Sequence, residues 1–250
     1  MSALEIAAGV AVLAGAALQS ATGFGFALVA APLLFAAAEP QRAVGLLIVL
    51  GLEVNLLTLL GEGRRPEPLR RDTLWILAWA VPGLAAGLLV LDSLDSTALQ
   101  VAVTLGVFAT LAVRALARRG APADRDAPLA WWAAPATGLT SGALTTSTNT
   151  AGPPVVLYLL ARGARPVETR DTLTATFIGL NGLGIAALAI SGTRGAAPPA
   201  AALAALVPLV VLGHLAGRPV FARLAEHRYE PVLTGVLVVT ALAGLLTALF

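Results

Sequence analysis

A polar segment marked by glycine and proline interrupts a long apolar stretch of this chain twice. Residues 20–32 read Ser-Ala-Thr-Gly-Phe-Gly-Phe-Ala-Leu-Val-Ala-Ala-Pro, and residues 141–153 read Ser-Gly-Ala-Leu-Thr-Thr-Ser-Thr-Asn-Thr-Ala-Gly-Pro. Unwound backbone at membrane depth is tolerated only where protein buries it or where it lines a water-filled cavity. Two such breaks in corresponding halves of a chain are the best sequence pointer to the binding site of a transporter.

Long apolar runs fill the chain, and the charged residues are confined to short clusters between them. The sequence is 58% hydrophobic and 12% charged, which is far more apolar than a soluble globular domain. About 20 helical residues span the ~30 Å hydrocarbon core of a bilayer. We therefore predict membrane segments near residues 4–38, 43–60, 73–91, 97–113, 129–161, 172–190, 197–217 and 231–249.

Two of these runs, residues 4–38 and 129–161, are too long for one straight span, and they contain the two breaks. Each is predicted to form a hairpin of two helices, or of shortened half-helices, that meet at the break. No basic residue precedes the first run, whereas a secretory signal peptide normally starts with positive charge. We therefore expect residues 4–20 to be retained in the membrane domain.

The basic residues, all sixteen of which are arginine, orient the predicted spans. Fourteen of them fall within four clusters, and only Arg42 and Arg194 lie elsewhere; the clusters occupy residues 64–71, 114–125, 162–170 and 218–228. Cytoplasmic loops are enriched in arginine and lysine, so the four clusters are placed in the cytoplasm. This placement requires both hairpins to enter and leave on the same side, and it puts both termini outside the cytoplasm.

The two halves of the chain then have opposite orientations. The predicted fold class is an all-α integral membrane protein of two inverted-topology repeats, residues 1–120 and 121–250. Each repeat consists of a broken-helix hairpin plus three transmembrane helices. Matching residues support the duplication: Arg42 with Arg170, Gly51 with Gly179, Glu53 with Asn181, Gly83 with Gly213 and Gly87 with Gly217.

The motifs at the breaks resemble those of a known family. Gly23-Phe-Gly-Phe followed by Pro32-Leu-Leu, and Gly152-Pro-Pro after a turn rich in threonine and serine, resemble the paired motifs of TauE/SafE proteins. These proteins, also called the TSUP family, are bacterial exporters of sulfite and organosulfonates, and the resemblance covers nearly the whole chain. It implies an all-helical carrier of two inverted repeats that moves small anionic, often sulfur-containing compounds. The second break lacks the glycine-rich form of the first, so the exact substrate stays open.

The first break offers an anion both hydroxyl and backbone donors. The predicted substrate-binding groups are the hydroxyls of Ser20 and Thr22 and the backbone N–H groups of Gly23, Phe24 and Gly25. Glycine lets backbone approach a ligand closely, and a half-helix that begins after the break would direct its positive end at an anion. The alternative is that the small residues only permit close helix packing.

The second break contains six consecutive polar residues, 145–150, within an apolar stretch. Burying such groups without partners costs roughly 1–3 kcal/mol each, a cost that a wet cavity or a polar ligand removes. The alternative is that the hydroxyls bond to carbonyls of their own helix, which Asn149 and Gly152 fit poorly. The predicted substrate-binding residues here are Ser141, Thr145, Thr146, Ser147, Thr148, Asn149 and Gly152.

Four polar residues within later spans are candidates for coupling or packing. An ionisable residue inside a span is a functional-site hypothesis by default. Glu53 is the candidate carrier of a coupling proton, unless it snorkels or pairs near the surface, and Asn55 lies in the same segment. Asn181 is a candidate for bonding substrate or backbone. His214 lies between two glycines, and we favour a packing role over proton handling.

These features favour a secondary transporter that exports a small anion across the bacterial cytoplasmic membrane. A Walker A motif requires lysine, which the chain lacks, so the energy must come from an ion gradient, the membrane potential or the substrate gradient. An anion channel with the same fold is the open alternative.

A membrane-embedded enzyme is disfavoured, because the chain has no cysteine, only two histidines, and no H-E-x-x-H or G-x-S-x-G motif. Neither a cofactor nor a metal is expected. The expected partners are a small anionic substrate and membrane lipid. The chain has no basic patch with interleaved aromatic residues, so nucleic acid is not an expected partner. Whether the protein forms a homo-oligomer is left open.

Overall fold

The computed structural model describes residues 2–61, 63, 65–94, 98, 101, 129–193 and 195–223. Helices account for the regular secondary structure of this part of the chain, and no strand occurs in it. The helices are α1 (Ala3–Thr22), α2 (Phe26–Ala37), α3 (Pro40–Gly61), α4 (Arg70–Ser93), α6 (Ala133–Ser147), α7 (Gly152–Ala161), α8 (Pro166–Ser191) and α9 (Ala200–Arg223).

The first long apolar run forms the expected hairpin, α1 followed by α2. Ser2 and Glu5 start α1 with a reciprocal capping box, in which each side chain accepts a hydrogen bond from the other residue's backbone N–H. The turn that joins the two helices, residues 23–25, depends on glycine. Gly23 and Gly25 have φ of 88° and 112°, a region that side chains with a Cβ enter only at a cost.

The second long apolar run also forms a hairpin, α6 followed by α7. Its turn, residues 148–151, contains Asn149 at φ 55°, and no other non-glycine residue of the described chain has positive φ. Asparagine is among the residues that tolerate this conformation. Proline in the first turn of α7 suits a helix start, because its missing N–H would have had no intrahelical partner there.

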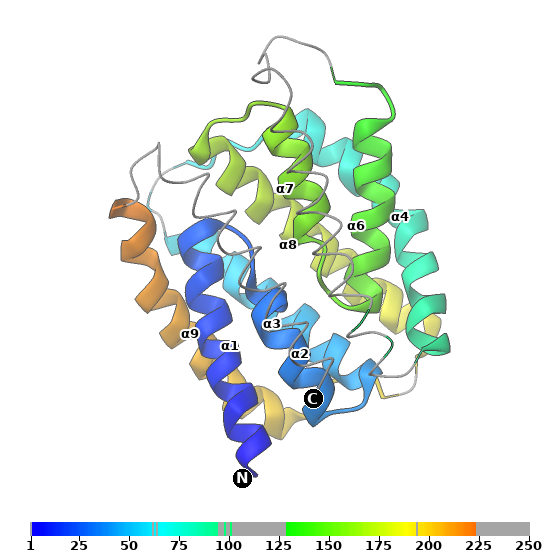
Figure 1. Cartoon of the computed structure of the whole chain (residues 1–250), viewed down its shortest axis with the longest axis vertical. Helices are drawn as coiled ribbons and strands as arrows, with labels where there is room; N and C mark the ends of the chain where they lie inside the picture. Colours follow the sequence, from blue (N-terminus) through cyan, green and yellow to red (C-terminus); the bar gives the residue numbers. More distant parts are fainter. Residues whose placement is uncertain are drawn as a thin grey trace.

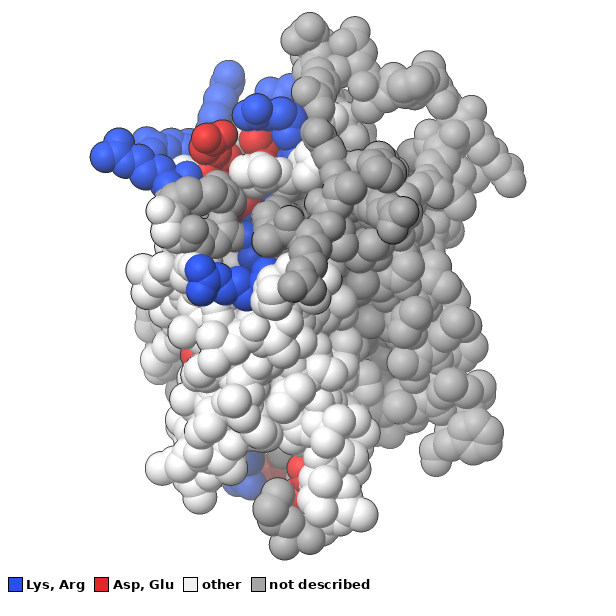
Figure 2. Space-filling model, turned by 90° about the vertical axis from the view of Figure 1, so that its left-hand side faces the viewer, with Lys and Arg blue, Asp and Glu red and all other residues white. Residues whose placement is uncertain are grey.

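Five of the described helices, α1, α3, α4, α8 and α9, are long and apolar enough to cross a membrane, and α2 and α7 are shorter apolar helices. The chain is therefore a multi-pass α-helical membrane protein. Charged side chains gather towards the upper end of the face in Figure 2, with a smaller group at its lower end and mostly uncharged residues between. The predicted segment 231–249, and 97–113 apart from residues 98 and 101, lie outside the described residues.

Close helix packing depends on glycines that face backbone. A Cβ on Gly83 or Gly87 of α4 would collide with carbonyl oxygens of Leu139 and Ala143 in α6. Gly213 and Gly217 of α9 are pressed in the same way against carbonyl oxygens of Leu13 and Ala17 in α1. Small residues let membrane helices approach this closely. The pairs α4–α6 and α1–α9 are the most extensive helix contacts of the described chain, and α3 packs against α8 between them.

The two hairpins run in opposite directions. Figure 1 shows α1 rising from the end where the N-terminus lies, and α6 descending from the other end, so that both turns lie inside the molecule. One apolar cluster joins α1, α2 and α3 to α9. A second cluster joins α4, α7 and α8, and Phe24 and Leu28 from the first hairpin enter it. The hairpins therefore meet within the core.

Candidate functional site

A cavity lies where the turns of the two hairpins meet. Its described lining comes from α1, α2, α3, α6, α7, α8 and both turns, and comprises Gln19, Gly25, Phe26, Ala27, Leu28, Gly51, Asn55, Thr145, Asn149, Thr150, Ala151, Gly152, Phe177, Leu180 and Asn181. The hairpins touch directly beside it, since a Cβ on Gly152 would lie 3.2 Å from Cδ2 of Phe24. None of the described lining residues is charged.

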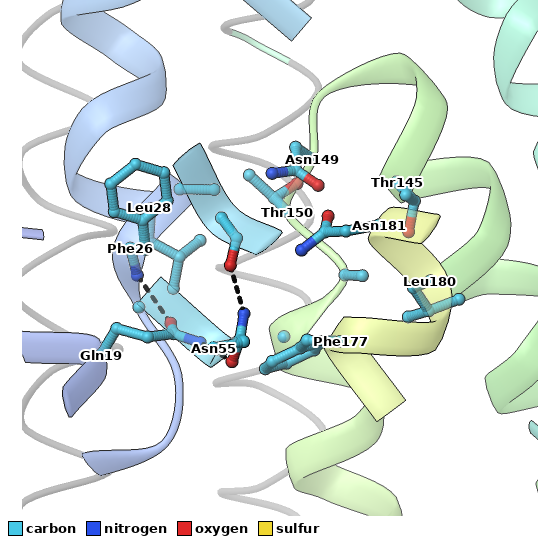
Figure 3. Close-up of a pocket in the computed structure, with 15 residues that line it drawn as sticks. Gln19, Phe26, Leu28, Asn55, Thr145, Asn149, Thr150, Phe177, Leu180 and Asn181 are labelled. Atoms are coloured by element: carbon cyan, nitrogen blue, oxygen red, sulfur yellow. Dashed lines mark hydrogen bonds between the residues drawn. The ribbon is translucent and has the colours of Figure 1, made fainter. Parts of the chain in front are cut away.

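On the first-hairpin side, the side chain of Gln19 organises the start of α2. The backbone N–H of Phe26 donates to Gln19 Oε1 at 3.0 Å, which satisfies one of the N–H groups that a helix start leaves without an intrahelical partner. Gln19 Nε2 donates to Asn55 Oδ1 at 2.9 Å, and Asn55 Nδ2 donates to the Gly51 carbonyl at 2.6 Å. Figure 3 shows part of this network along the cavity wall. The turn is thereby tied to α3.

On the second-hairpin side, Asn149 and Asn181 present amides to the cavity. Figure 3 shows these side chains near each other, across the cavity from Gln19. Their Nδ2 atoms each lie 3.2 Å from the position that a Cβ on Gly51 would occupy, so a larger residue at position 51 would displace them. The close approach of α3 to these amides therefore requires glycine at that position.

Two helices begin at the cavity, α2 at Phe26 and α7 at Gly152. A helix N-terminus carries a partial positive charge and N–H groups without intrahelical partners, both of which favour anions. The donors are unequal, because Pro153 and Pro154 of α7 have no N–H to offer. The arrangement suits a small anion held by dipoles and amides. The described residues contain no cluster of three or more His, Cys, Asp or Glu side chains that could hold a metal ion.

The structure brings only some of the predicted site residues to this cavity. Those that line it are Gly25, Thr145, Asn149, Gly152 and Asn181. Those that are not part of its lining are Ser20, Thr22, Gly23, Phe24, Glu53, Ser141, Thr146, Ser147 and Thr148. Both breaks are thus represented at the cavity, but mainly by backbone and amide groups.

The hydroxyls of the second break donate to backbone carbonyls, three of them to carbonyls of their own helix. Thr145, Ser147 and Thr148 donate to the carbonyl four residues earlier, at 2.7, 2.7 and 3.3 Å. Thr146 donates across the helix contact to the carbonyl of Leu84 in α4 at 2.7 Å. Ser141 reaches the carbonyl of Ala151 at 3.5 Å. These hydroxyls are therefore satisfied by the protein itself, and of the five residues only Thr145 is part of the described lining.

The polar groups of the first break are also used internally. Thr22 Oγ1 donates to the carbonyls of Leu18 and Phe24, at 2.9 and 2.8 Å. Ser20 Oγ lies 2.9 Å from Nδ1 of the buried His214, which is the packing role expected for that histidine. Phe24 is fully buried.

A buried arginine lies behind the first turn, and the sequence did not predict it there. Arg170, assigned to a cytoplasmic loop cluster, falls inside α8 and is 1% exposed. Its Nη2 donates to the carbonyl of Ser20 at 2.7 Å, where a cation suits the negative end of α1. Its Cγ lies 3.0 Å from the position of a Cβ on Gly23. The helix starts at Pro166, six residues before the apolar run, because Pro166 and Glu168 form a favourable first turn.

The helix starts give a correspondence between the halves that differs from the sequence match. The interval from Phe26 to Gly152, where α2 and α7 begin, equals that from Pro40 to Pro166, where α3 and α8 begin. The same interval relates pairs of cavity residues: Gln19 with Thr145, Gly25 with Ala151, Phe26 with Gly152, Gly51 with Phe177, and Asn55 with Asn181. At this interval Asn181 pairs with Asn55, whereas the sequence match paired it with Glu53.

Glu53 lies on α3 away from the cavity lining. Its Oε2 is buried, and no described residue forms a hydrogen bond with that oxygen. Gln19 and Asn55 are the functional candidates that sequence reasoning missed or left aside. Both could have been found from the sequence, because each is an amide inside an apolar span. Gln19 directly precedes the first break.

The comparisons with known proteins agree with the resemblance seen in the sequence. A family model described as sulfite exporter TauE/SafE matches residues 7–244. No curated protein and no solved structure matches the chain.

Proposed function

Because the chain belongs to the sulfite exporter TauE/SafE family, we propose that it is a secondary transporter that exports a small anion across the bacterial cytoplasmic membrane. Sulfite, an organosulfonate or a related organic acid is the proposed substrate. The observation that carries the proposal is the cavity where the two hairpin turns meet and two helices begin. No enzymatic activity is proposed.

A site of this kind suits a carrier. Dipoles and amides attract an anion without the tight ion pair that a lining arginine would form, so binding and release both remain feasible. The buried Arg170 contributes its positive charge from behind the first turn, at the Ser20 carbonyl. The anion is therefore attracted by the dipoles and amides of an uncharged cavity wall and by the positive charge of Arg170 behind it.

We further propose that residues 1–120 and 121–250 are inverted repeats. In this arrangement α1 to α4 correspond to α6 to α9. The described contacts support this arrangement. α1 packs on α9, and their proposed counterparts, α6 and α4, pack on each other in the same way. The glycine pairs at both contacts occupy matching places. The cavity would then lie on the pseudo-two-fold axis, where inverted-repeat transporters bind their substrates.

The proposed orientation places the ends of α3 and α7 in the cytoplasm and both termini outside. Arg162 pairs with Asp72 at 3.5 Å, and Arg165 approaches Glu67 at 3.6 Å. These contacts bring the arginine clusters at 64–71 and 162–170 to one end of the molecule, as the positive-inside rule requires of cytoplasmic loops.

Counterflow in proteoliposomes tests the function. Vesicles that contain the purified protein are loaded with unlabelled sulfite and diluted into a trace of labelled sulfite. A carrier should give transient accumulation of label and saturable initial rates, whereas a channel should give neither. Protein-free vesicles are the control. Absence of flux for sulfite, sulfate, sulfoacetate, taurine and simple carboxylates would contradict the proposal.

A further inference from the structure

The polar side chains at the cavity are amides and hydroxyls. The amides are Gln19, Asn55, Asn149 and Asn181, and the hydroxyls are those of Thr145 and Thr150. Buried titratable or charged groups on the surrounding helices include Tyr158 of α7, Arg170 and Asp171 of α8, and His214 of α9, and the half-buried Glu53 of α3 has a buried Oε2. None of them is part of the described lining. An ion in this cavity therefore contacts no charged side chain of the described lining, and the positive charge of Arg170 lies behind the first turn.

Two of the four amides form hydrogen bonds with other groups of the protein, and two do not. Gln19 and Asn55 bond to each other, to the Phe26 N–H and to the Gly51 carbonyl. In the described part of the chain, the side chains of Asn149 and Asn181 form no hydrogen bond. Asn181 is nonetheless 95% buried, with 5% of its surface exposed. Buried amides require partners, so a ligand or water in the cavity has to supply them.

Backbone conformation fixes the position of Asn149 in the second turn. The residue adopts φ 55°, where glycine would be less strained. Asparagine is one of the few side-chain-bearing residues that adopt this left-handed conformation readily. An amide at this position is thus held against the cavity by the turn itself.

The charge of the ligand follows from the neutral wall. In a continuum description, doubling an ion's charge raises the cost of removing it from water about fourfold, because that cost scales with the square of the charge. Its attraction to fixed dipoles rises only about twofold, since that term is linear in charge. A site of dipoles and amides therefore discriminates against dianions.

The amides also favour a proton on the ligand. An asparagine side chain offers two N–H donors and one carbonyl acceptor. The donors suit the unprotonated oxygens of an oxyanion, and the acceptor suits an O–H group. A fully deprotonated oxyanion would leave that acceptor facing an anion.

We propose, building on the proposed function, that the cavity binds its oxyanion as the singly charged, proton-bearing form, with Asn149 and Asn181 as the ligand-binding side chains. For sulfite, the bound species is hydrogen sulfite. In solution hydrogen sulfite is in equilibrium with the sulfite dianion. The apparent affinity of the cavity for sulfite should therefore depend on pH through the ionisation of the ligand itself.

The test is a binding titration on the purified full-length protein across the second ionisation of sulfurous acid. The ligands are sulfite, sulfate as a dianion, and nitrate and methanesulfonate as monoanions whose charge does not change with pH. Above the ionisation, the apparent affinity for sulfite should fall about tenfold per pH unit, and sulfate should bind at least tenfold more weakly than hydrogen sulfite. Any titration of Glu53 or His214 should also change the affinity for nitrate and methanesulfonate. Dividing the sulfite affinity by theirs at each pH removes this effect.

Sulfite affinity that stays constant or rises with pH, after this correction, would overturn the charge assignment while leaving an anion transporter intact. If none of the four ligands binds at any pH, the proposed function fails, and this inference with it.

Variants test the two side chains separately. Asn149→Gly keeps a residue suited to positive φ and removes the amide, and Asn181→Ala removes the other. Each should weaken sulfite binding at least tenfold at unchanged melting temperature. Gly182→Ala, one residue away on an exposed part of α8 with nothing within 4 Å of the new methyl group, is the matched control. Sulfite affinity equal to that of the control in both amide variants would refute the assignment.

Discussion

At the residue scale, the polar side chains differ in how many hydrogen-bonding groups they carry, and thus in how completely one helix turn satisfies them. The hydroxyls of Thr145, Ser147 and Thr148 are short enough to reach the carbonyl one turn back, so their helix satisfies them. Asparagine and glutamine carry two donors and an acceptor, more than one helix turn absorbs. Gln19 and Asn55 therefore bond between helices, and Asn149 and Asn181 face the cavity.

Replacing Glu53 by glutamine tests its proposed role in coupling. If Glu53 carries the coupling proton, Glu53→Gln should abolish transport driven by a proton gradient and leave sulfite exchange largely intact, because the amide cannot release a proton. The measurement compares gradient-driven uptake with counterflow in the same vesicles. Glu39→Gln, in the exposed connection before α3, should change neither. Undiminished proton-driven transport by Glu53→Gln would reduce Glu53 to a structural polar residue.

Gly23→Ala should destabilise the first hairpin. The residue has φ 88°, and its new Cβ would lie 3.0 Å from Arg170 Cγ. A left-handed conformation costs a residue with a Cβ about 1–2 kcal/mol, so the melting temperature in detergent should fall. Gly182→Ala, which gains helix propensity without a contact, should melt at or above the wild-type temperature. Equal melting temperatures for the two variants would argue against strain at the first turn.

At the scale of elements, each hairpin is held in place by a glycine-lined contact with a helix of the other half. Gly83 and Gly87 of α4 press on α6, and Gly213 and Gly217 of α9 press on α1. Thr146 crosses the first contact to the Leu84 carbonyl, and Ser20 crosses the second to His214. A hairpin is therefore fixed to the opposite half more extensively than to its own third helix.

Gly87→Val should loosen the contact between α4 and α6. The new side chain would collide with the Ala143 carbonyl and with Thr146 Oγ1, and overpacking typically costs about 1–3 kcal/mol. Thermal unfolding in detergent measures the loss. Ala86→Val, on the exposed side of α4, adds bulk without this collision and should unfold at nearly the wild-type temperature. If both variants unfold alike, the contact does not depend on glycine.

At the scale of the whole molecule, opposite hairpins create one shared cavity. Each turn alone would leave polar backbone at membrane depth, which lipid cannot satisfy. Because the hairpins run in opposite directions, each turn lies against the other and against α3 or α8. The arrangement that buries both turns therefore also forms the proposed binding cavity.

Reporter fusions test the proposed topology. Placing the four arginine clusters in the cytoplasm predicts that Phe250 lies outside and Gly120 in the cytoplasm. A phosphatase that is active only outside should therefore be active when fused after Phe250 and inactive when fused after Gly120, and a cytoplasmic fluorescent reporter should give the reverse pattern. Reporters in one compartment at both positions would remove the basis for inverted repeats.

Much of the architecture could be predicted because its causes are local. Hydropathy located the spans, and excess length together with glycine and proline located both hairpin turns. The family followed from the same motifs. The site was predicted less completely: Gly25, Thr145, Asn149, Gly152 and Asn181 lie at the cavity, while Gln19 and Asn55 had to be seen in place.

The sequence by itself determined that this chain forms membrane helices with two broken hairpins. The length and hydropathy of each apolar run and the dihedral preferences of glycine are local properties that need no tertiary contacts. Only the tertiary structure decided which polar groups face the cavity, that Arg170 is buried behind the first turn, and that Asn55 lies at the cavity together with Asn181. The reason is physical. In a membrane helix the lipid-facing and protein-facing sides are both apolar, so no hydrophobic period reveals which side points inward, and helix contacts alone set that direction.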